Sequence, residues 1–497
     1  MTEQPEQPSR PTPSARPSGG ARLSDRVAAW QAGFGPAMRG FLWQPPPRFP
    51  GSAPRGRQLL AGNIRLAGTL LQTETTPWAL DPPSAAFSDA LHGFDWLDDL
   101  ATLPKGVGRN TAQTWLADWL KRYGKGRGPG WTADLVGRRQ IRWISQVLFL
   151  LSGQPRDETV AFESALSRQT AFLAKRWKQT SPGLPRFEAL TGLVYSACSL
   201  IGMEHHLAPA LSGLARECTK QISPLGGIKT RNPEELLEIF VHLTWVAQIL
   251  QETGKPADPS VDTALLRIAP TLRALRHADG SLARAHGGGR GAPGRLVGAL
   301  VQSGVRPSRI KGLAMGFARM AAGRVTVIAD AAPPMIGPAG VNAHASTLGF
   351  EMVSANTPVI VSAGSGAAFG PEWRRAGRAT VSHSTLSLEG YSSSRLPEGS
   401  RQNQPDRQGF AEGPTDVALQ SSDLPGGESI TFSHDGWRRT HGLVHLRGLS
   451  LEDKGSLLRG EDAIAALDEA DRERFEAINR ALPADRGLRY SVRFPLH

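Results

Sequence analysis

The spacing of apolar residues changes near residue 321, and this change constrains the fold more than any other feature of the sequence. Before it, apolar residues recur at the spacing of amphipathic helices; Ile141, Ile144 and Val147, for example, lie on one helical stripe. From Gly323 onward, short runs rich in β-branched residues alternate with turn residues. Helices followed by strands indicate two separate layers of architecture and exclude a doubly wound sheet.

The helical part consists of several apolar stripes separated by glycine and proline. Their spacing predicts helices over residues 111–122, 140–151, 157–176, 186–202, 207–221, 233–252 and 260–276. The breaks between them are short, as at Gly153 to Pro155. Helices joined in this way form a bundle, a solenoid or a closed toroid, and the absence of a fixed-period repeat argues against a solenoid.

The second part has the pattern of an antiparallel sandwich. Strands are predicted over residues 324–329, 347–353, 358–362 and 385–388, a polar surface helix over 468–486, and a last strand over 490–494. Because the chain stops just after that strand, at His497, we expect a truncated sandwich. The domain boundaries that follow are a disordered Pro/Ser/Gln-rich tail over 1–25, a helical domain over 26–321 and a sandwich domain over 322–497.

The net charge of +12, from 57 Lys+Arg against 45 Asp+Glu, favours a polyanionic partner, either nucleic acid or an acidic glycan. A compositional bias towards Arg, Gly, Ala and Pro is the other explanation. No helix-turn-helix, RNP or zinc-finger pattern is present, so we expect no nucleic-acid partner. The N-terminus has no apolar stretch typical of a signal peptide, and no run is apolar and long enough to span a membrane.

Several short motifs occur in a fixed order along the chain. They are LHGFDWL at 91–97, Trp131 and Trp143, Arg231-Asn-Pro233, DGSL at 279–282, AHASTLGFE at 343–351, EWRRAGRATVSHSTL at 372–386, SHDGW at 433–437, LRGED at 458–462 and VRFPLH at 492–497. Together they resemble the heparinase II/III-like family over roughly residues 50–497. The resemblance implies an incomplete (α/α) toroid followed by an antiparallel β-sandwich. It also implies an acidic, uronate-containing polysaccharide as partner, cleaved by β-elimination.

β-Elimination removes a weakly acidic C5 proton beside a carboxylate, so it needs a group that neutralises the carboxylate, a base and an acid. Asn232, with Arg231 beside it, is the candidate neutralising group, because an amide or guanidinium donates hydrogen bonds to carboxylate oxygens. The same asparagine followed by Pro233 and Glu235 is typical of a helix N-cap. Both roles are open.

His383 is the leading candidate for catalysis, and His344 is a second candidate. Arg374, Arg375 and Arg378 lie a few residues upstream of His383 and are candidate substrate ligands. Their positive charges are also expected to keep His383 neutral near pH 7. The alternative is that both histidines are ordinary hydrogen-bonded residues beside core strands.

Lyases of this family use a tyrosine of the helical domain as acid or base, but this chain has no tyrosine between residues 196 and 390. Tyr391, in a Gly-Tyr-Ser loop, is the remaining candidate, since Tyr195 lies on an apolar helical stripe. Trp78 and Trp96 are candidate platforms for sugar rings, with core packing as the alternative.

The resemblance also implies a metal site in some members, for which His434, Asp435 and His497 are the candidate ligands and zinc or calcium the candidate ion. The spacing matches no compact ligand motif, Pro495 stands where the family has a histidine, and surface or strand histidines are the alternative. The elimination itself requires no cofactor.

Two functional hypotheses follow. The chain is either a polysaccharide lyase acting on an acidic glycan, or a non-catalytic acidic-glycan-binding relative that has lost the tyrosine. The resemblance implies the cell envelope or periplasm, whereas the absence of a visible signal peptide leaves a cytoplasmic location open. The sequence predicts no particular oligomeric state.

Overall fold

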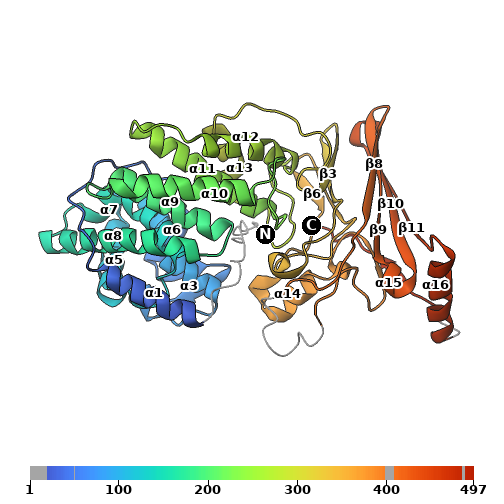
Figure 1. The fold of residues 1–497 in the computed structure, drawn as a ribbon, viewed down its shortest axis with the longest axis horizontal. Coiled ribbons are helices and arrows are strands. Elements are labelled where there is room, and N and C mark those ends of the chain that lie inside the picture. Colours follow the sequence, from blue (N-terminus) through green and yellow to red (C-terminus); the bar gives the residue numbers. More distant parts are fainter. Residues whose placement is uncertain (1–18, 50, 398–407, 484–486) are drawn as a thin grey trace. The chain divides into compact units, whose positions relative to one another are not determined.

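The computed structural model describes residues 19–49, 51–397, 408–483 and 487–497 (Figure 1). These residues form two compact units. The helical unit consists of residues 19–222 and Glu238–Leu265, and the sandwich unit consists of Ser223–Leu237 and Leu266–His497. Residues 1–18 of the predicted tail lie outside the described residues, and the first helix begins at Gly19.

Helices make up most of the helical unit. Its elements are α1 (Gly19–Ala32), α2 (Ala53–Leu60), the hairpin β1 (Asn63–Leu66) and β2 (Thr69–Gln72), α3 (Ala85–His92), α4 (Asp95–Ala101), α5 (Arg109–Tyr123), α6 (Ala133–Ser145), α7 (Val147–Leu151), α8 (Arg156–Arg176), α9 (Leu184–Ser199) and α10 (Leu207–Gln221). Two further helices, α11 (Pro233–Glu252) and α12 (Pro259–Ala274), contribute residues to both units. Within the described residues, no helix is long and apolar enough to cross a membrane.

The predicted helices are present, with one difference. The predicted helix over 140–151 is interrupted, because Gln146 leaves helical geometry at φ −106° and ψ 17° and separates α6 from α7. The other boundaries agree with the prediction to within a few residues.

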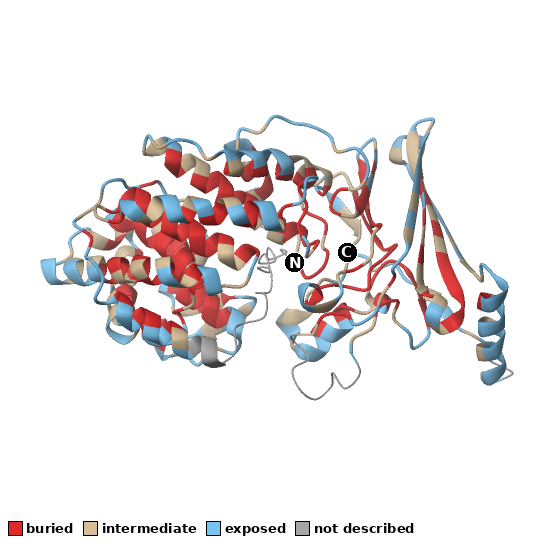
Figure 2. Cartoon of the chain, in the orientation of Figure 1, coloured by how far each residue is buried: buried red, intermediate tan, exposed pale blue. Residues whose placement is uncertain are grey.

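The helices α6 and α9 cross with their backbones in contact, and nearly all residues of both helices are buried (Figure 2). The contact depends on two glycines. A Cβ atom on Gly192 would lie 2.4 Å from the Cα of Gly137, and one on Gly137 would lie 2.3 Å from the carbonyl oxygen of Glu188. Both distances are below van der Waals contact, so only glycine fits at this crossing.

The sandwich unit contains two four-stranded antiparallel sheets and a short additional pair of strands. One sheet has the order β3 (Phe317–Ala322), β4 (Val325–Asp330), β5 (Phe350–Ser354), β6 (Thr357–Ile360), and the other has the order β8 (Val417–Leu424), β9 (Gly427–Trp437), β10 (Leu443–Glu452), β11 (Leu457–Ala465). The pair is β7 (Leu386–Leu388) with β12 (Tyr490–Val492). The helices of this unit are α13 (Arg295–Gln302), α14 (Pro371–Gly377), α15 (Arg438–His441) and α16 (Glu469–Ala481).

The two sheets share one apolar core. Val327 and Phe350 from the first sheet and Phe432 and Leu451 from the second belong to a single buried cluster. Alternate residues along β9 face this core, as the two-residue period of a strand requires. The predicted strands over 324–329, 347–353, 358–362, 385–388 and 490–494 and the helix over 468–486 are all present with shifted ends. The long strands β8 to β11 were not among the predicted elements.

The glycine crossing can be tested with a matched pair of alanine substitutions. Gly192→Ala is expected to destabilise the protein by about 1–3 kcal/mol, because the new Cβ forces α6 and α9 apart. Gly298→Ala, within α13, meets no atom within 4 Å and is expected to raise stability by about 0.5–1 kcal/mol. Thermal denaturation of both variants measures the difference, and equal effects would contradict a steric requirement at Gly192.

Candidate functional site

Three buried histidines from separate segments of the sandwich unit lie close together. His286 lies in the loop between α12 and α13, His344 in the loop before β5, and His383 just before β7. The ring centroids of His286 and His344 are 6.1 Å apart, and those of His344 and His383 are 5.1 Å apart. The backbone N–H of His344 donates a 3.1 Å hydrogen bond to Nδ1 of His286. The structure therefore brings the two predicted histidines together and adds a third.

Asp330, the last residue of β4, lies beside this group of histidines. Its Oδ2 accepts a 2.6 Å hydrogen bond from Ser346 and lies 3.6 Å from Nε2 of His286. Its Oδ1 accepts a 2.5 Å hydrogen bond from Nη2 of Arg231, and both side chains are buried. A buried carboxylate is stable only when it is paired in this way.

Arg231, predicted to bind substrate, is occupied by contacts within the protein. Besides Asp330, its guanidinium donates to the backbone oxygens of Met315, Gly316, Ala332 and Pro333 at 2.9–3.0 Å. Its backbone has a φ of 55°, a conformation that is strained for a residue with a side chain. These contacts stabilise that conformation and leave each guanidinium nitrogen with a partner already.

Asn232 is the N-cap of α11, as the sequence pattern indicates. Its Oδ1 accepts hydrogen bonds from the backbone N–H groups of Glu234 at 3.0 Å and Glu235 at 3.1 Å. A Cβ on Gly288 would lie 2.3 Å from this oxygen, so the loop that carries His286 passes directly over the cap. Nδ2 of Asn232 is buried and has no hydrogen-bond partner among the described residues. Capping thus occupies the oxygen, and only the amide nitrogen remains for another partner.

Burial keeps the three histidine rings neutral. It lowers the pKa of His383 from 6.5 to about 4, although the negative charges of Asp330 and Glu351 oppose this shift. The pKa values of His286 and His344 are also lowered well below their usual value, first by burial and then by neighbouring positive groups. The predicted neutrality of His383 therefore has a different cause, since burial and not the nearby arginines lowers its pKa.

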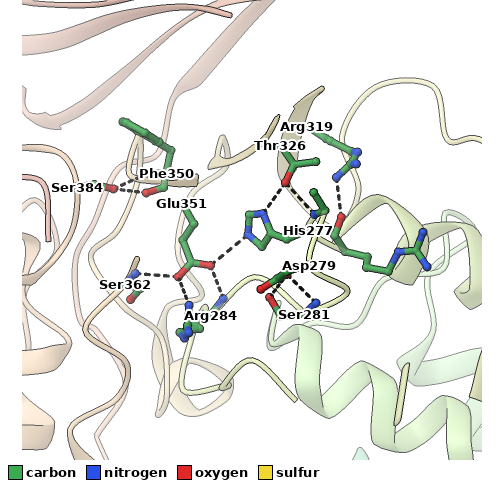
Figure 3. Close-up of polar contacts among 12 residues, drawn as sticks. His277, Asp279, Ser281, Arg284, Arg319, Thr326, Phe350, Glu351, Ser362 and Ser384 are labelled. Carbon is green, nitrogen blue, oxygen red and sulfur yellow. Dashed lines mark hydrogen bonds and ion pairs between the residues drawn. The ribbon is translucent and has the colours of Figure 1, made fainter. Parts of the chain in front are cut away.

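Glu351 forms a second polar cluster with His277, Arg284 and Ser362 (Figure 3). Its carboxylate accepts 2.8 Å hydrogen bonds from the backbone N–H groups of Arg284 and Ser362, and Nε2 of His277 lies 3.4 Å away. Burial alone would raise the pKa of Glu351, but His277, Arg284 and the N–H of Ser362 together lower it. Glu351 is thus a buried carboxylate that stays ionised.

His277 is in turn oriented by Thr326, on the opposite side of its ring (Figure 3). The Thr326 hydroxyl accepts from the backbone N–H of Ala278 at 3.1 Å and lies 3.0 Å from Nδ1 of His277. When the hydroxyl donates its own proton to Nδ1, the ring proton lies on Nε2, which faces Glu351. This arrangement was not predicted, although Glu351 ends one quoted motif and His277 lies two residues before another.

The two clusters share a small cavity. Its lining includes Asp330, His344, Ser346, Glu351, His383 and Ser384. The volume open to the centre of a water molecule is about 30 Å³. Because one water needs roughly 10–15 Å³ by this measure, the cavity holds about two waters. Both ring nitrogens of His344, and Nε2 of His383, have no hydrogen-bond partner among the described residues, so such waters are their expected partners.

The three arginines upstream of His383 do not act together. Arg374 is buried and donates to the carbonyl of Val341 and to Oδ1 of Asn342, at 3.0 and 2.7 Å. Arg378 is also buried and donates to loop carbonyls, and burial lowers its pKa to about 10. Only Arg375 is exposed. Two of the three predicted substrate ligands, Arg374 and Arg378, therefore bind within the protein, where they connect α14 to the loop of His344.

The predicted aromatic platforms are core residues. Trp78 is 5% exposed and Trp96 is 0% exposed, and their indole N–H groups donate to the backbone oxygens of Trp115 and Leu91. Neither ring offers a face to a sugar from solvent. Tyr391 is half-exposed, as a catalytic loop residue requires, but its ring packs edge-on against His441 at 4.5 Å.

The predicted metal ligands do not fit a metal site. His434 and Asp435 are successive residues of β9, so their side chains point to opposite faces of the sheet. His434 is buried, whereas both carboxylate oxygens of Asp435 hold Thr415. His497 is exposed at the end of the chain. Across the described ranges, no group of three or more His, Cys, Asp or Glu side chains is arranged to hold a metal ion.

Comparisons with known proteins agree with this architecture. The family model for the heparinase II/III-like C-terminal domain matches residues 305–497. FtsZ-localized protein C of Caulobacter vibrioides (strain NA1000 / CB15N) is 31% identical over 471 residues, which cover 93% of this chain and 78% of that protein.

Solved structures of heparinase III are similar in fold. One superposes with a TM-score of 0.54 at 14% identity, covering 78% of this chain and 64% of that chain. A second heparinase III structure has the same TM-score and identity, over 79% of this chain and 67% of that chain. This chain thus spans less than two thirds of the first heparinase III. The comparison confirms the predicted fold class, an incomplete (α/α) toroid followed by an antiparallel β-sandwich.

Arg231 and Arg375 were predicted to have the same role, and their exchange for methionine separates structure from binding. Arg231→Met is expected to lower the free energy of unfolding by about 3–5 kcal/mol, because it leaves Asp330 buried without its charged partner. Arg375→Met, at an exposed position, is expected to change it by less than about 0.5 kcal/mol. Urea denaturation measures both, and a small effect at Arg231 would mean that the ion pair is not structural.

The buried His383 predicts a pH dependence of stability. Between about pH 6.5 and pH 4 the unfolded chain binds a proton on this ring and the folded protein does not, so stability falls as the pH decreases through this window. His383 alone contributes a slope of up to about 1.4 kcal/mol per pH unit. In the variant His383→Gln, the slope of the unfolding free energy against pH is therefore expected to decrease by the equivalent of about one bound proton. Urea denaturation at several pH values measures this slope. An unchanged slope would show that folding does not lower the pKa of this ring.

Proposed function

This chain belongs to the heparinase II/III-like family, and we propose that it is a non-catalytic member that localises with FtsZ. The observation that carries the proposal is its 31% identity to FtsZ-localized protein C over 93% of the chain. The construction of the histidine site supports the loss of catalysis.

β-Elimination requires groups that reach the substrate, and the candidate groups of this chain are directed inward. His344 and His383 are 1% and 3% exposed, and the volume open to water centres in their shared cavity is about 30 Å³. Arg231 is saturated by backbone oxygens, and the oxygen of Asn232 is used by its helix. A general base must come within hydrogen-bond reach of the proton that it removes, and the burial of both rings opposes such an approach by a sugar.

The four tyrosines of the chain also support this proposal. Tyr195 is buried, its hydroxyl accepts a 3.0 Å hydrogen bond from Nε of Arg48, and burial raises its pKa. Tyr123 packs against Trp78 and Trp119 within the helical unit. Tyr391 and Tyr490 are exposed residues of the sandwich unit, and neither is among the residues that line the histidine cavity. The acid that the lyases of this family take from a tyrosine therefore has no evident source here.

The second candidate function is the lyase itself, acting on an acidic uronate-containing glycan. One specific observation favours it, namely that the unpartnered nitrogens of His344 and His383 and the amide nitrogen of Asn232 are neutral groups of the kind elimination uses. This function requires the loop that carries His286 to move away and admit a sugar.

The expected location of the protein differs between the two candidate functions, the lyase and the non-catalytic member that localises with FtsZ. The family resemblance predicts the cell envelope or periplasm, where glycan-degrading members act. The name of the 31% identical relative associates that protein with FtsZ, and we propose the same association for this chain.

A combined test separates the two functions. A fluorescent fusion of the full chain is expected to co-localise with FtsZ in its native cells, and His383→Ala is expected to co-localise equally well. The purified protein is expected to give no rise in ultraviolet absorbance from unsaturated products on uronate polymers. Diffuse fluorescence would contradict the proposed localisation. Product formation that is abolished by His383→Ala but not by His497→Ala, an exposed control, would establish the lyase instead.

A further inference from the structure

Two large aromatic side chains project from the sandwich unit at α14. Phe369 lies just before this helix, and Trp373 lies on it. Phe369 is 78% exposed and Trp373 is 64% exposed, and their ring centroids are 6.3 Å apart in an edge-on arrangement. Arg375, also exposed, lies on the same helix. We call Phe369, Trp373 and Arg375 the aromatic surface. Exposed rings that lie together on a folded surface are typical of interaction sites.

The backbone beneath this surface is firmly held. Gly366, at φ 65°, begins a short 3₁₀ turn over Ala367–Phe369, and a Cβ there would lie 2.3 Å from the carbonyl oxygen of Trp373. The turn therefore packs directly on α14. The N–H of Arg374 donates to the carbonyl of Gly370 at 3.0 Å, which joins the turn to the first residues of the helix.

The inward side of α14 is fixed to the loop of His344. Arg374, Gly377 and Arg378 are buried, and the two guanidiniums donate to Val341, Asn342 and Ala343. Consequently the rings of Phe369 and Trp373 are exposed because their segment is anchored with its other face inward, and not because it lacks contacts. A rigid anchor loses little conformational entropy when it binds.

We propose that the aromatic surface is the docking site for an acidic protein partner, into which Phe369 and Trp373 insert as apolar anchors. The inference rests on the proposed localisation with FtsZ, because it places a protein partner on this chain. Tryptophan and arginine are the residues most often responsible for affinity at protein interfaces, particularly where a ring fills a pocket of the partner. The net charge of +12 favours an acidic partner. Since Glu372 is exposed on the same helix, the rings and not the charge are expected to supply most of the affinity.

A glycan is the less favoured occupant of this surface. Pockets for small ligands are mostly concave, with a few polar groups that fix the ligand's orientation. Phe369 and Trp373 instead project outward, with more than half of each side chain in solvent. Projecting rings match a partner that supplies the pocket.

The test measures the affinity of the full chain for purified FtsZ of the same organism. Trp373→Ala and Phe369→Ala are each expected to weaken binding by about tenfold or more, as truncation of a buried anchor does. Arg375→Glu is expected to have a smaller effect that decreases with added salt. Tyr490→Ala, a matched control at a 61% exposed aromatic residue of the same unit, is expected to bind like the wild type. Thermal denaturation checks that all four variants are folded.

The results test the docking site and the proposed function separately. If the wild-type chain binds FtsZ and the ring variants bind equally well, the docking site is wrong and the proposed function stands. If the wild-type chain neither binds nor co-localises with FtsZ, the proposed function and the inference built on it both fail. If the ring variants lose binding to a uronate polymer but not to FtsZ, the aromatic surface is a glycan site and the protein docking site is overturned.

Discussion

The ion pair between Arg231 and Asp330 is the interaction on which the centre of the sandwich unit depends. Arg231 lies immediately before the cap of α11, and Asp330 ends β4. The pair joins a helix start to a sheet and, through Ser346, to the loop of His344. It also holds Arg231 in a left-handed backbone conformation that few residues tolerate. Since the chain bends at this point to set Asn232 over the helix end, this buried salt bridge fixes the start of α11 against β4 and the loop of His344.

Arginine has a common role throughout this region. Loops that connect the strands present carbonyl oxygens without ladder partners, and buried oxygens of this kind must be paired. A guanidinium carries five N–H donors in a planar fork and can satisfy several carbonyls at once. Arg231, Arg374 and Arg378 all do this. In the sequence, a cluster of arginines beside candidate catalytic histidines therefore predicts a substrate site. In the structure, these arginines mainly stabilise loops.

Local patterns were predictable, and contacts between distant residues were not. The helices α5 to α12 followed from apolar spacing, and the cap at Asn232 followed from the Pro and Glu residues after it. The strands β8 to β11 lack the β-branched runs that identify strands; β9, for example, contains Gly, Ser, His and Asp, and its pattern becomes clear only when its partners are known. The histidine site was half predicted. His344 and His383 stood out as motif residues, but His277 and Glu351 are 74 positions apart, and nothing local indicates that they meet.

The buried rings of His344 and His383 give this protein a built-in reporter of its own motion. A reagent that modifies imidazole from solvent cannot reach a ring that is 1% or 3% exposed unless the surrounding loops separate. The rate of modification then measures how often that opening occurs, because local opening precedes reaction. Any ligand or partner that closes the loops further slows the modification, and any that parts them accelerates it. The burial that keeps solvent reagents away from these histidines therefore makes their modification rate a sensitive measure of local opening at the site.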